Sequence, residues 1–247
     1  MGQYETKNIW WAVKQGSINS DIVTITPAET TPPRIVVGLK WMDMGKSNLR
    51  VNAYVDSVGC NTFRAHIDTW SDSTLYNGAL SWLKLSSGDP DFQCGTFSCN
   101  GEASEWVSFD WFFNSPPTVF VGLSKFDIGK DWHASVYATN ISKTGFTIHA
   151  KKWGNTHFYK CTVTWVAVVN GKEGVLCGTF GGDSTTGSGY SGWTSFSPAF
   201  NHTPTILTAF KMFDVDRDQN FRVGVKTTAH KTGMSWTIST WAGSRIY

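Results

Sequence analysis

The sequence predicts an all-β protein made of three tandem antiparallel β-sandwich lobes with about six short strands each. A segment that runs from a proline to an aspartate ten residues later recurs three times, at 33–43, 117–127 and 204–214. Apolar and polar residues alternate with period two in stretches such as 49–55 and 221–225, which is typical of half-buried strands. No stretch shows sustained helical periodicity. One third of the 247 residues is about 82, long enough for a small sandwich and too long for one solenoid repeat.

The three copies also share spacings downstream of that aspartate. A tryptophan follows it after 27, 26 and 27 residues, and a tyrosine follows each tryptophan after six. These residues are Trp70, Trp153 and Trp241, then Tyr76, Tyr159 and Tyr247. Two copies continue with Trp82 or Trp165, and twelve residues later with Cys-Gly-Thr-Phe at 94–97 or 177–180. Random polar loops would not keep such spacings, so we interpret the chain as three structural repeats.

The third copy reaches its tyrosine at the last residue, and no closing strand follows. Tyr4 precedes Trp10 by six residues, the spacing that separates tyrosine and tryptophan in the other copies. We therefore expect the segment from Tyr4 to Val13 to complete the third lobe, although the match could arise by chance. The predicted lobes are 14–85, 86–168, and 169–247 together with 1–13.

Composition excludes several function classes. The chain has 21 Lys and Arg against 19 Asp and Glu, a net charge of +2, which provides no electrostatic footprint for nucleic acid. No apolar run approaches the ~18 residues of a membrane span. The first residues show neither a basic nor an apolar segment typical of export. We therefore expect a cytoplasmic protein or one released without a leader.

Aromatic residues are abundant, with 13 Trp, 16 Phe and 7 Tyr, or 15% of the chain. Such side chains suit pleated, half-buried surfaces. A flat ring can also lie against the apolar C–H face of a sugar. Most of these rings are expected in the core.

Metal ligands and cofactor motifs are poorly represented. The five cysteines show no CxxC spacing, so we expect reduced, buried thiols, although Cys94 and Cys99 could pair locally. The segment Asp214–Asp218 begins like a calcium loop, but Gln219 and Val225 replace the required glycine and glutamate. We expect no metal and no cofactor.

The ordered motifs resemble the H-type lectin family, the snail-agglutinin and discoidin C-terminal type of domain. They are a Pro-Pro apolar strand, Asn-Leu-Arg-Val at 48–51 or Asn-Phe-Arg-Val at 220–223, Thr-Gly-Phe at 144–146, and the Trp–turn–Tyr hairpin. The resemblance covers most of all three copies and is weaker at 14–30, 98–108 and 181–195. It implies a six-stranded sandwich that binds N-acetylgalactosamine or galactose without metal. Family members form trimers, so three lobes in one chain imply a covalent pseudo-threefold ring locked by the N-terminal strand.

The resemblance also implies one glycan site per copy. The family arginine matches Arg50 and Arg222, whereas His133 takes its place in the second copy; the other site residues are the tryptophans and tyrosines named above. The residue after each tryptophan, often histidine in the family, is Ser71, Gly154 or Ala242. Candidates for the acidic partner are Asp21, Glu102 and Asp183. From the residues alone, a Trp–Tyr hairpin end with an arginine fork suits an uncharged polar ligand. The alternative is that the tryptophans are core and the arginines lie on a solvated strand face.

Two other functions stay open. A glycoside-active enzyme or its accessory module needs two carboxylates about 5–10 Å apart, and only Asp43, Asp127 and Asp214 recur in all three copies. These aspartates directly follow an apolar strand segment, which predicts turn capping. A ring with a purely structural or interaction role is the third possibility. The oligomeric state beyond one chain is not predicted.

Overall fold

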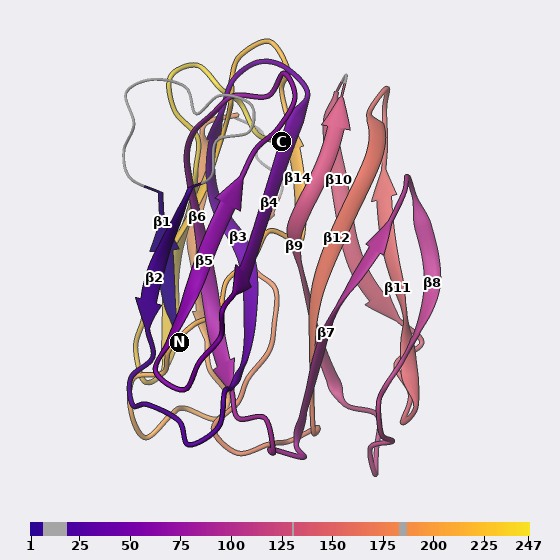
Figure 1. The fold of residues 1–247 in the computed structure, drawn as a ribbon. Coiled ribbons are helices and arrows are strands. Elements are labelled where there is room, and N and C mark those ends of the chain that lie inside the picture. Colours follow the sequence, from indigo (N-terminus) through magenta and orange to yellow (C-terminus); the bar gives the residue numbers. More distant parts are fainter. Residues whose placement is uncertain (7–18, 130, 183–186) are drawn as a thin grey trace.

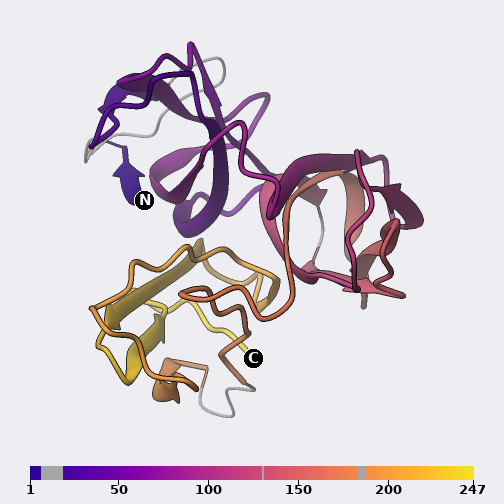
Figure 2. The same cartoon turned by 90° about the horizontal axis from the view of Figure 1, so that it is seen from below.

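The computed structural model describes residues 1–6, 19–129, 131–182 and 187–247. These residues form sixteen strands and no helix. The strands are arranged as three lobes around a common centre (Figure 2), and all pairings are antiparallel (Figure 1). The predicted all-β class with three antiparallel lobes is confirmed. None of the described residues forms a helix that could cross a membrane.

The first lobe is a sandwich of two three-stranded layers. Its strands are β1 (Gly2–Glu5), β2 (Ser20–Thr24), β3 (Arg34–Met44), β4 (Leu49–Asp56), β5 (Thr62–Asp68) and β6 (Leu75–Leu85). One layer has the order β1-β6-β3 and the other β2-β5-β4. Phe63 and Trp82 meet between the layers edge to face, with ring centroids 5.0 Å apart.

The second lobe repeats this arrangement. Its strands are β7 (Phe92–Cys99), β8 (Ala103–Ser108), β9 (Thr118–Gly129), β10 (Trp132–Thr139), β11 (Gly145–Lys152) and β12 (His157–Val168). The layers are β7-β12-β9 and β8-β11-β10. Trp165 packs between them against Phe146, at a centroid distance of 5.6 Å.

The third lobe has one complete layer. Its strands are β13 (Gly189–Ser195), β14 (Met212–Val215), β15 (Phe221–Ala229) and β16 (Gly233–Ser239). The layer β13-β16-β15 matches β8-β11-β10 of the second lobe. In the other layer the described residues form only β14 and an isolated bridge between Val215 and Ile246.

Strand pairs across the lobe boundaries close the ring. β4 of the first lobe pairs with β9 of the second, β10 of the second pairs with β14 of the third, and β15 of the third pairs with β3 of the first. Each of the three sheets therefore continues from one lobe into the next. The ring is closed by these three equivalent junctions.

The position of the N-terminal strand corrects the sequence-based expectation. β1 pairs with β6, with Tyr4 opposite Leu80, so Tyr4 and Glu5 belong to the first lobe and not to the third. A Cβ on Gly2 would lie 2.9 Å from the Trp82 ring, so this glycine allows the strand to lie against the tryptophan. Residues Met1–Tyr4 therefore correspond to residues 94–97 of the second lobe. They do not correspond to the strand that was expected to close the third lobe. The rest of the predicted segment, residues 7–13, lies outside the described residues.

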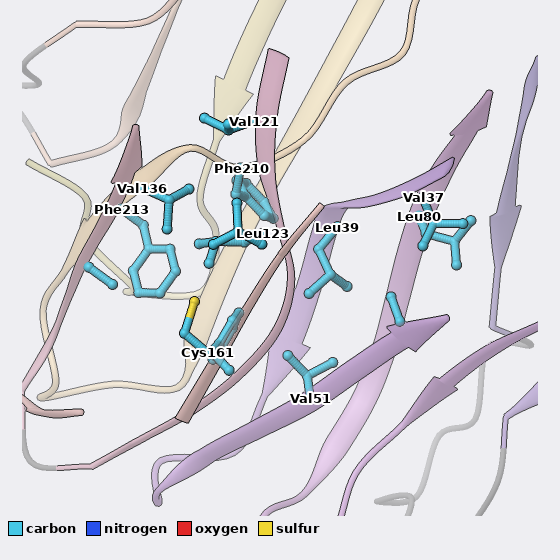
Figure 3. Close-up of a cluster of buried hydrophobic side chains, with 14 of the residues drawn as sticks. Val37, Leu39, Val51, Leu80, Val121, Leu123, Val136, Cys161, Phe210 and Phe213 are labelled. Atoms are coloured by element: carbon cyan, nitrogen blue, oxygen red, sulfur yellow. The ribbon is translucent and has the colours of Figure 1, made fainter. Parts of the chain in front are cut away.

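The three lobes share one core along the central axis. A Cβ on Gly38 or Gly122 would lie 2.4 or 2.3 Å from the Cβ of Ala209, so these equivalent positions converge. The next residue of each copy is Leu39, Leu123 or Phe210, and the Phe210 amide donates to the Leu39 carbonyl at 2.8 Å. Figure 3 shows Phe210 beside Leu123 in this cluster. Burial of these side chains is the main force that holds the lobes together.

Candidate functional site

The same tight turn follows the tryptophan in all three copies. The amide of the third residue after it donates to the tryptophan carbonyl, at 3.3 Å for Trp70, 3.3 Å for Trp153 and 3.1 Å for Trp241. The residue after the tryptophan has a positive φ in each case: 60° at Ser71, 57° at Gly154 and 50° at Ala242. This left-handed conformation is disfavoured for residues other than glycine. Each turn presents its tryptophan at a lobe boundary.

The arginines and the histidine bind an aspartate of the neighbouring lobe. Arg50 Nε lies 3.2 Å from Asp127 Oδ1, and Arg222 Nε lies 3.2 Å from Asp43 Oδ1. His133 Nε2 lies 3.4 Å from Asp214 Oδ1. Each pair is also directly opposite in strand register. The three boundaries therefore carry equivalent pairs of an arginine or histidine with an aspartate.

These contacts correct the expectation that the recurring aspartates cap turns. The three aspartates lie inside β3, β9 and β14, where they receive donors across a lobe boundary. The sequence feature that could have indicated this role is the recurrence of the aspartate in all three copies. Sequence reasoning missed their role because a cross-lobe partner cannot be read from spacing along one chain.

The tryptophans contact the same neighbouring lobe. Trp153 Nε1 donates to Asp214 Oδ2 at 3.1 Å, and Trp241 donates to Asp43. Trp241 stacks on Trp41 at a centroid distance of 4.6 Å. All three site tryptophans are half-buried. Their rings are neither fully enclosed in the core nor fully exposed to solvent.

The arginines also hold the tryptophan turn of their own lobe. Arg50 Nη1 forms an ion pair with Asp72, and Arg222 Nη1 donates to the Ala242 carbonyl at 3.3 Å. Burial tends to raise the pKa of Asp72, but hydrogen bonds from its own backbone and from Arg50 outweigh this and lower it. Asp72 is largely exposed, with 61% of its side chain accessible.

The aspartate at the third boundary, Asp43, is largely buried, with 20% of its side chain exposed. Desolvation raises the pKa of the Asp43 carboxyl above its ordinary value, although Arg222 and the Trp241 hydrogen bond act in the opposite direction. The charged form is thus disfavoured by its surroundings and favoured by its two partners. The Asp43 carboxylate is therefore a hydrogen-bond acceptor at the third boundary.

Each site tyrosine lies beside the aspartate of its own lobe. The strand register slips between Asp43 and Met44 opposite Tyr76, and a register shift between Phe158 and Lys160 marks the same bulge at Tyr159. The Tyr247 amide donates to the Asp214 carbonyl at 3.0 Å. A bulge re-aims a side chain, and bulges are frequent next to binding sites.

The sites therefore combine residues of two lobes. The first boundary has Arg50, Trp70 and Ser71 with Asp127 and Tyr159. The second has His133 and Trp153 with Asp214 and Tyr247, and the third has Arg222 and Trp241 with Asp43 and Tyr76. The sequence placed the tyrosine and the tryptophan of one hairpin in one site, whereas the structure places Tyr247 in the lining of a cleft together with His133 of the neighbouring lobe. Tyr159 and Tyr247 are 45% and 47% exposed, so their rings are accessible to a ligand.

The second boundary opens into a cleft of about 560 Å³. His133, Asp214 and Tyr247 line it together with Lys46 and Arg217. This lining offers donors and acceptors in similar numbers, which suits a neutral polar ligand.

The predicted acidic partners have different surroundings. Glu102 accepts a hydrogen bond from the Lys152 amide at 3.4 Å, so it lies beside the Trp153 turn of its own lobe. Asp21 is exposed on β2 and accepts from the Ile22 amide at 2.8 Å. Asp183 lies outside the described residues. The carboxylates that the structure places across a boundary are instead Asp43, Asp127 and Asp214.

Comparison with known proteins identifies the family. The model of the H-type lectin domain matches residues 30–83, 104–168 and 194–247, well over half of the chain. The chain belongs to the H-type lectin domain family. Three matches in order along the chain show three tandem copies of the H-type lectin domain. The family assignment supports a carbohydrate-binding lectin.

Two solved structures of discoidin II from Dictyostelium discoideum are also similar to the chain. The wild-type structure is 17% identical, with 63% of this chain and 77% of that chain covered and a TM-score of 0.29. The recombinant native structure is 17% identical, with 64% and 79% covered and a TM-score of 0.30. Because both scores are low, the assignment to the H-type lectins rests on the family match. No curated protein shows a significant match.

Potential metal ligands are spread over the described part of the chain. Among the residues that the structure describes, no group of three His, Cys, Asp or Glu side chains could hold a metal ion. Within the calcium-like segment, the Asp218 amide donates to Asp216 Oδ1 at 2.8 Å, a local turn of the type aspartate favours. The described cysteines are free thiols, and Cys99 lies opposite Cys161, not next to Cys94.

Proposed function

We propose that this lectin binds terminal N-acetylgalactosamine or galactose at its three lobe boundaries, without metal, and engages several glycans at once. The supporting observation is the repeated cross-lobe arrangement of one tryptophan, one arginine or histidine, one aspartate and one tyrosine. The family assignment supports the ligand class. The three lobes form one chain, so the sites have fixed spacing.

The side chains at each boundary suit a neutral sugar. A half-buried tryptophan edge and a tyrosine ring offer apolar surface to the C–H face of a pyranose. The aspartate accepts hydrogen bonds from hydroxyl groups or from an amide, and the guanidinium donates to vicinal oxygens. An N-acetyl group adds one donor, one acceptor and a methyl group that can contact an aromatic ring.

The three sites differ in strength. Arg50 and Arg222 each present a planar fork of guanidinium donors, whereas the imidazole of His133 offers fewer donors. Ser71 adds a hydroxyl at the first boundary, while Gly154 and Ala242 add none. We expect the first boundary to bind best and the second to bind least.

Calorimetry with free galactose and N-acetylgalactosamine, followed by a glycan array, tests this proposal. The variant Trp70→Ala should remove one site and lower the stoichiometry by about one. Trp193→Ala is the matched control, because Trp193 is 51% exposed on β13 and away from the boundaries. Clustered glycans should bind far more tightly than free sugar, since linked sites raise the effective concentration. A stoichiometry of zero for all related sugars would contradict the proposal, and binding lost on EDTA treatment would contradict metal independence.

A further inference from the structure

A lysine lies over the site tryptophan of the first boundary. Lys125, in β9 of the second lobe, places its ammonium group 5.2 Å from the centroid of the Trp70 ring. The corresponding residue, two positions before the aspartate, is Trp41 at the third boundary, where it stacks on Trp241. At the second boundary it is Met212. At this position the three boundaries therefore carry a cation, an aromatic ring and a thioether.

A second lysine extends the positive charge beside Trp70. Lys160 of β12 lies opposite Asp127 of β9, and Lys125 precedes Asp127 by two residues on the same strand. Residues two apart on a strand, and residues directly opposite on neighbouring strands, share one face of a sheet. Arg50 lies opposite Asp127 on the other side, in β4. This sheet face therefore brings three cations together around one carboxylate.

The carboxylates at this boundary are already bound to Arg50. Asp127 lies 3.2 Å from its Nε, and Asp72 pairs with its Nη1. In the part of the chain that the structure describes, neither Lys125 nor Lys160 forms an ion pair. Burial and the charge of Lys160 lower the pKa of Lys125 below its ordinary value, although Asp127 acts in the opposite direction. The half-buried ammonium group of Lys125 therefore lacks compensating negative charge.

We infer that the first boundary selects an acidic sugar, a galactose-type pyranose that carries a sulfate ester or a carboxylate. This inference rests on the proposed sugar binding at the lobe boundaries and names the ligand class of one of them. The acidic group lies beside the Lys125 and Lys160 ammonium groups, while the pyranose contacts the Trp70 ring. A lysine binds an anion as a point charge, so the two lysines accept either a sulfate or a carboxylate.

The same position makes the second boundary a neutral reference. A neutral sugar at Trp70 leaves the Lys125 charge without a partner, whereas an acidic substituent pairs with it at short range. At the second boundary the Met212 side chain is uncharged and 53% exposed, so an acidic substituent gains no ion pair from this residue. We therefore expect a preference for acidic sugars at Trp70 and none at Trp153.

The test follows the indole N–H signals of Trp70 and Trp153 in NMR titrations of the full chain, assigned with Trp70→Phe and Trp153→Phe. The ligands are galactose, its 3-sulfate and 6-sulfate, and galacturonic acid, which compare a neutral sugar with a sulfate and a carboxylate. At least one acidic sugar should bind at Trp70 about fivefold more tightly than galactose, the upper range for one partly exposed ion pair. The acidic sugar that binds more tightly identifies the acidic group. Raising the salt concentration to about 0.5 M should weaken the preference, because salt screens exposed charges.

Two substitutions introduce the residues that other copies carry at these positions. Lys125→Met introduces the residue of the second boundary and should remove most of the preference at Trp70. Lys160→Asn introduces the residue that follows the tyrosine in the first copy and should reduce the preference less, because Lys160 is exposed. Lys226→Met is the matched control, since Lys226 also lies over a tryptophan ring, that of Trp41, at 5.6 Å. It should leave the preference at Trp70 unchanged.

The outcomes separate this inference from the proposed function. Equal binding of galactose and all the acidic sugars at Trp70, or a preference that survives Lys125→Met, would overturn the inference and leave sugar binding at the boundaries intact. Signals of Trp70, Trp153 and Trp241 that respond to none of the sugars would overturn both.

Discussion

The second and third lobes carry the same sequence motifs, but the described residues form six strands in the second lobe and four in the third. In the second lobe, β12 covers the interior, and Phe146 and Trp165 are enclosed between two layers. In the third lobe, the equivalent interior opens into a cleft of about 830 Å³. The turns, the cross-lobe aspartate and the site tryptophan are nevertheless alike in both lobes. The comparison shows that the boundary sites depend on the strands that join lobes, whereas core enclosure depends on the central strand of each lobe.

The largest expected effect is on core packing. Phe146→Ala in the second lobe should lower the free energy of unfolding by about 3–5 kcal/mol, because an enclosed cavity remains. Ile238→Ala in the third lobe should cost about 2 kcal/mol or less, because the Ile238 side chain lines an open cleft. Urea unfolding with both variants measures the difference. Equal losses would mean that the third lobe is as well enclosed as the second.

A second prediction compares the boundaries. Arg50→Ala leaves Asp127 largely buried and unpaired, since their side chains are only 13% and 18% exposed; we expect a loss of about 2–3 kcal/mol. His133→Ala should cost about 1 kcal/mol, because Asp214 keeps its hydrogen bond from Trp153. Urea unfolding and calorimetry with sugar should both rank Arg50→Ala as more damaging. The reverse ranking would show that His133 is not equivalent to the arginines.

Removing β1 should make the first lobe resemble the third. Deletion of residues 1–5 uncovers the edge of β6 and one face of Trp82, which is only 6% exposed in the intact chain. We expect a loss of about 1–2 kcal/mol and a tendency to aggregate through the free edge. Thermal melting and sedimentation velocity report both effects. A deletion variant that melts like the full chain and stays monodisperse would rule out this role for β1.

The smallest effect concerns His149 of the second lobe. The third lobe has no histidine at the equivalent position. His149 stacks on Tyr137 and bonds to Thr139 at 2.7 Å, whereas Thr237 takes its place in the third lobe. Burial, with a contribution from Lys151, lowers the pKa of His149 below its ordinary value of 6.5. Its folded state therefore favours the neutral ring, and this contribution to stability is present above pH 6.5 and lost as the pH falls through the folded value. Titration of the ring by NMR should give a midpoint below 6.5.

Much of this protein could be predicted from its sequence. The Pro-to-Asp and Trp-to-Tyr spacings predicted three lobes, and period-two alternation predicted strands. The tryptophans, the tyrosines and Arg50 could be proposed as site residues because a repeated local motif can be recognised without knowledge of its neighbours in space. The residue after each tryptophan keeps a left-handed backbone whether it is serine, glycine or alanine, because the turn is a local feature of chain geometry.

Tertiary structure alone decided which lobe each strand and each site residue joined. The spacing from Tyr4 to Trp10 suggested a closing strand for the third lobe, but Gly2 lies against Trp82 and places β1 in the first. Asp43, Asp127 and Asp214 acquire their role only when a neighbouring lobe brings an arginine or histidine opposite them. Local spacing determines backbone conformation along one segment, whereas strand partners are selected by packing between segments far apart in the chain.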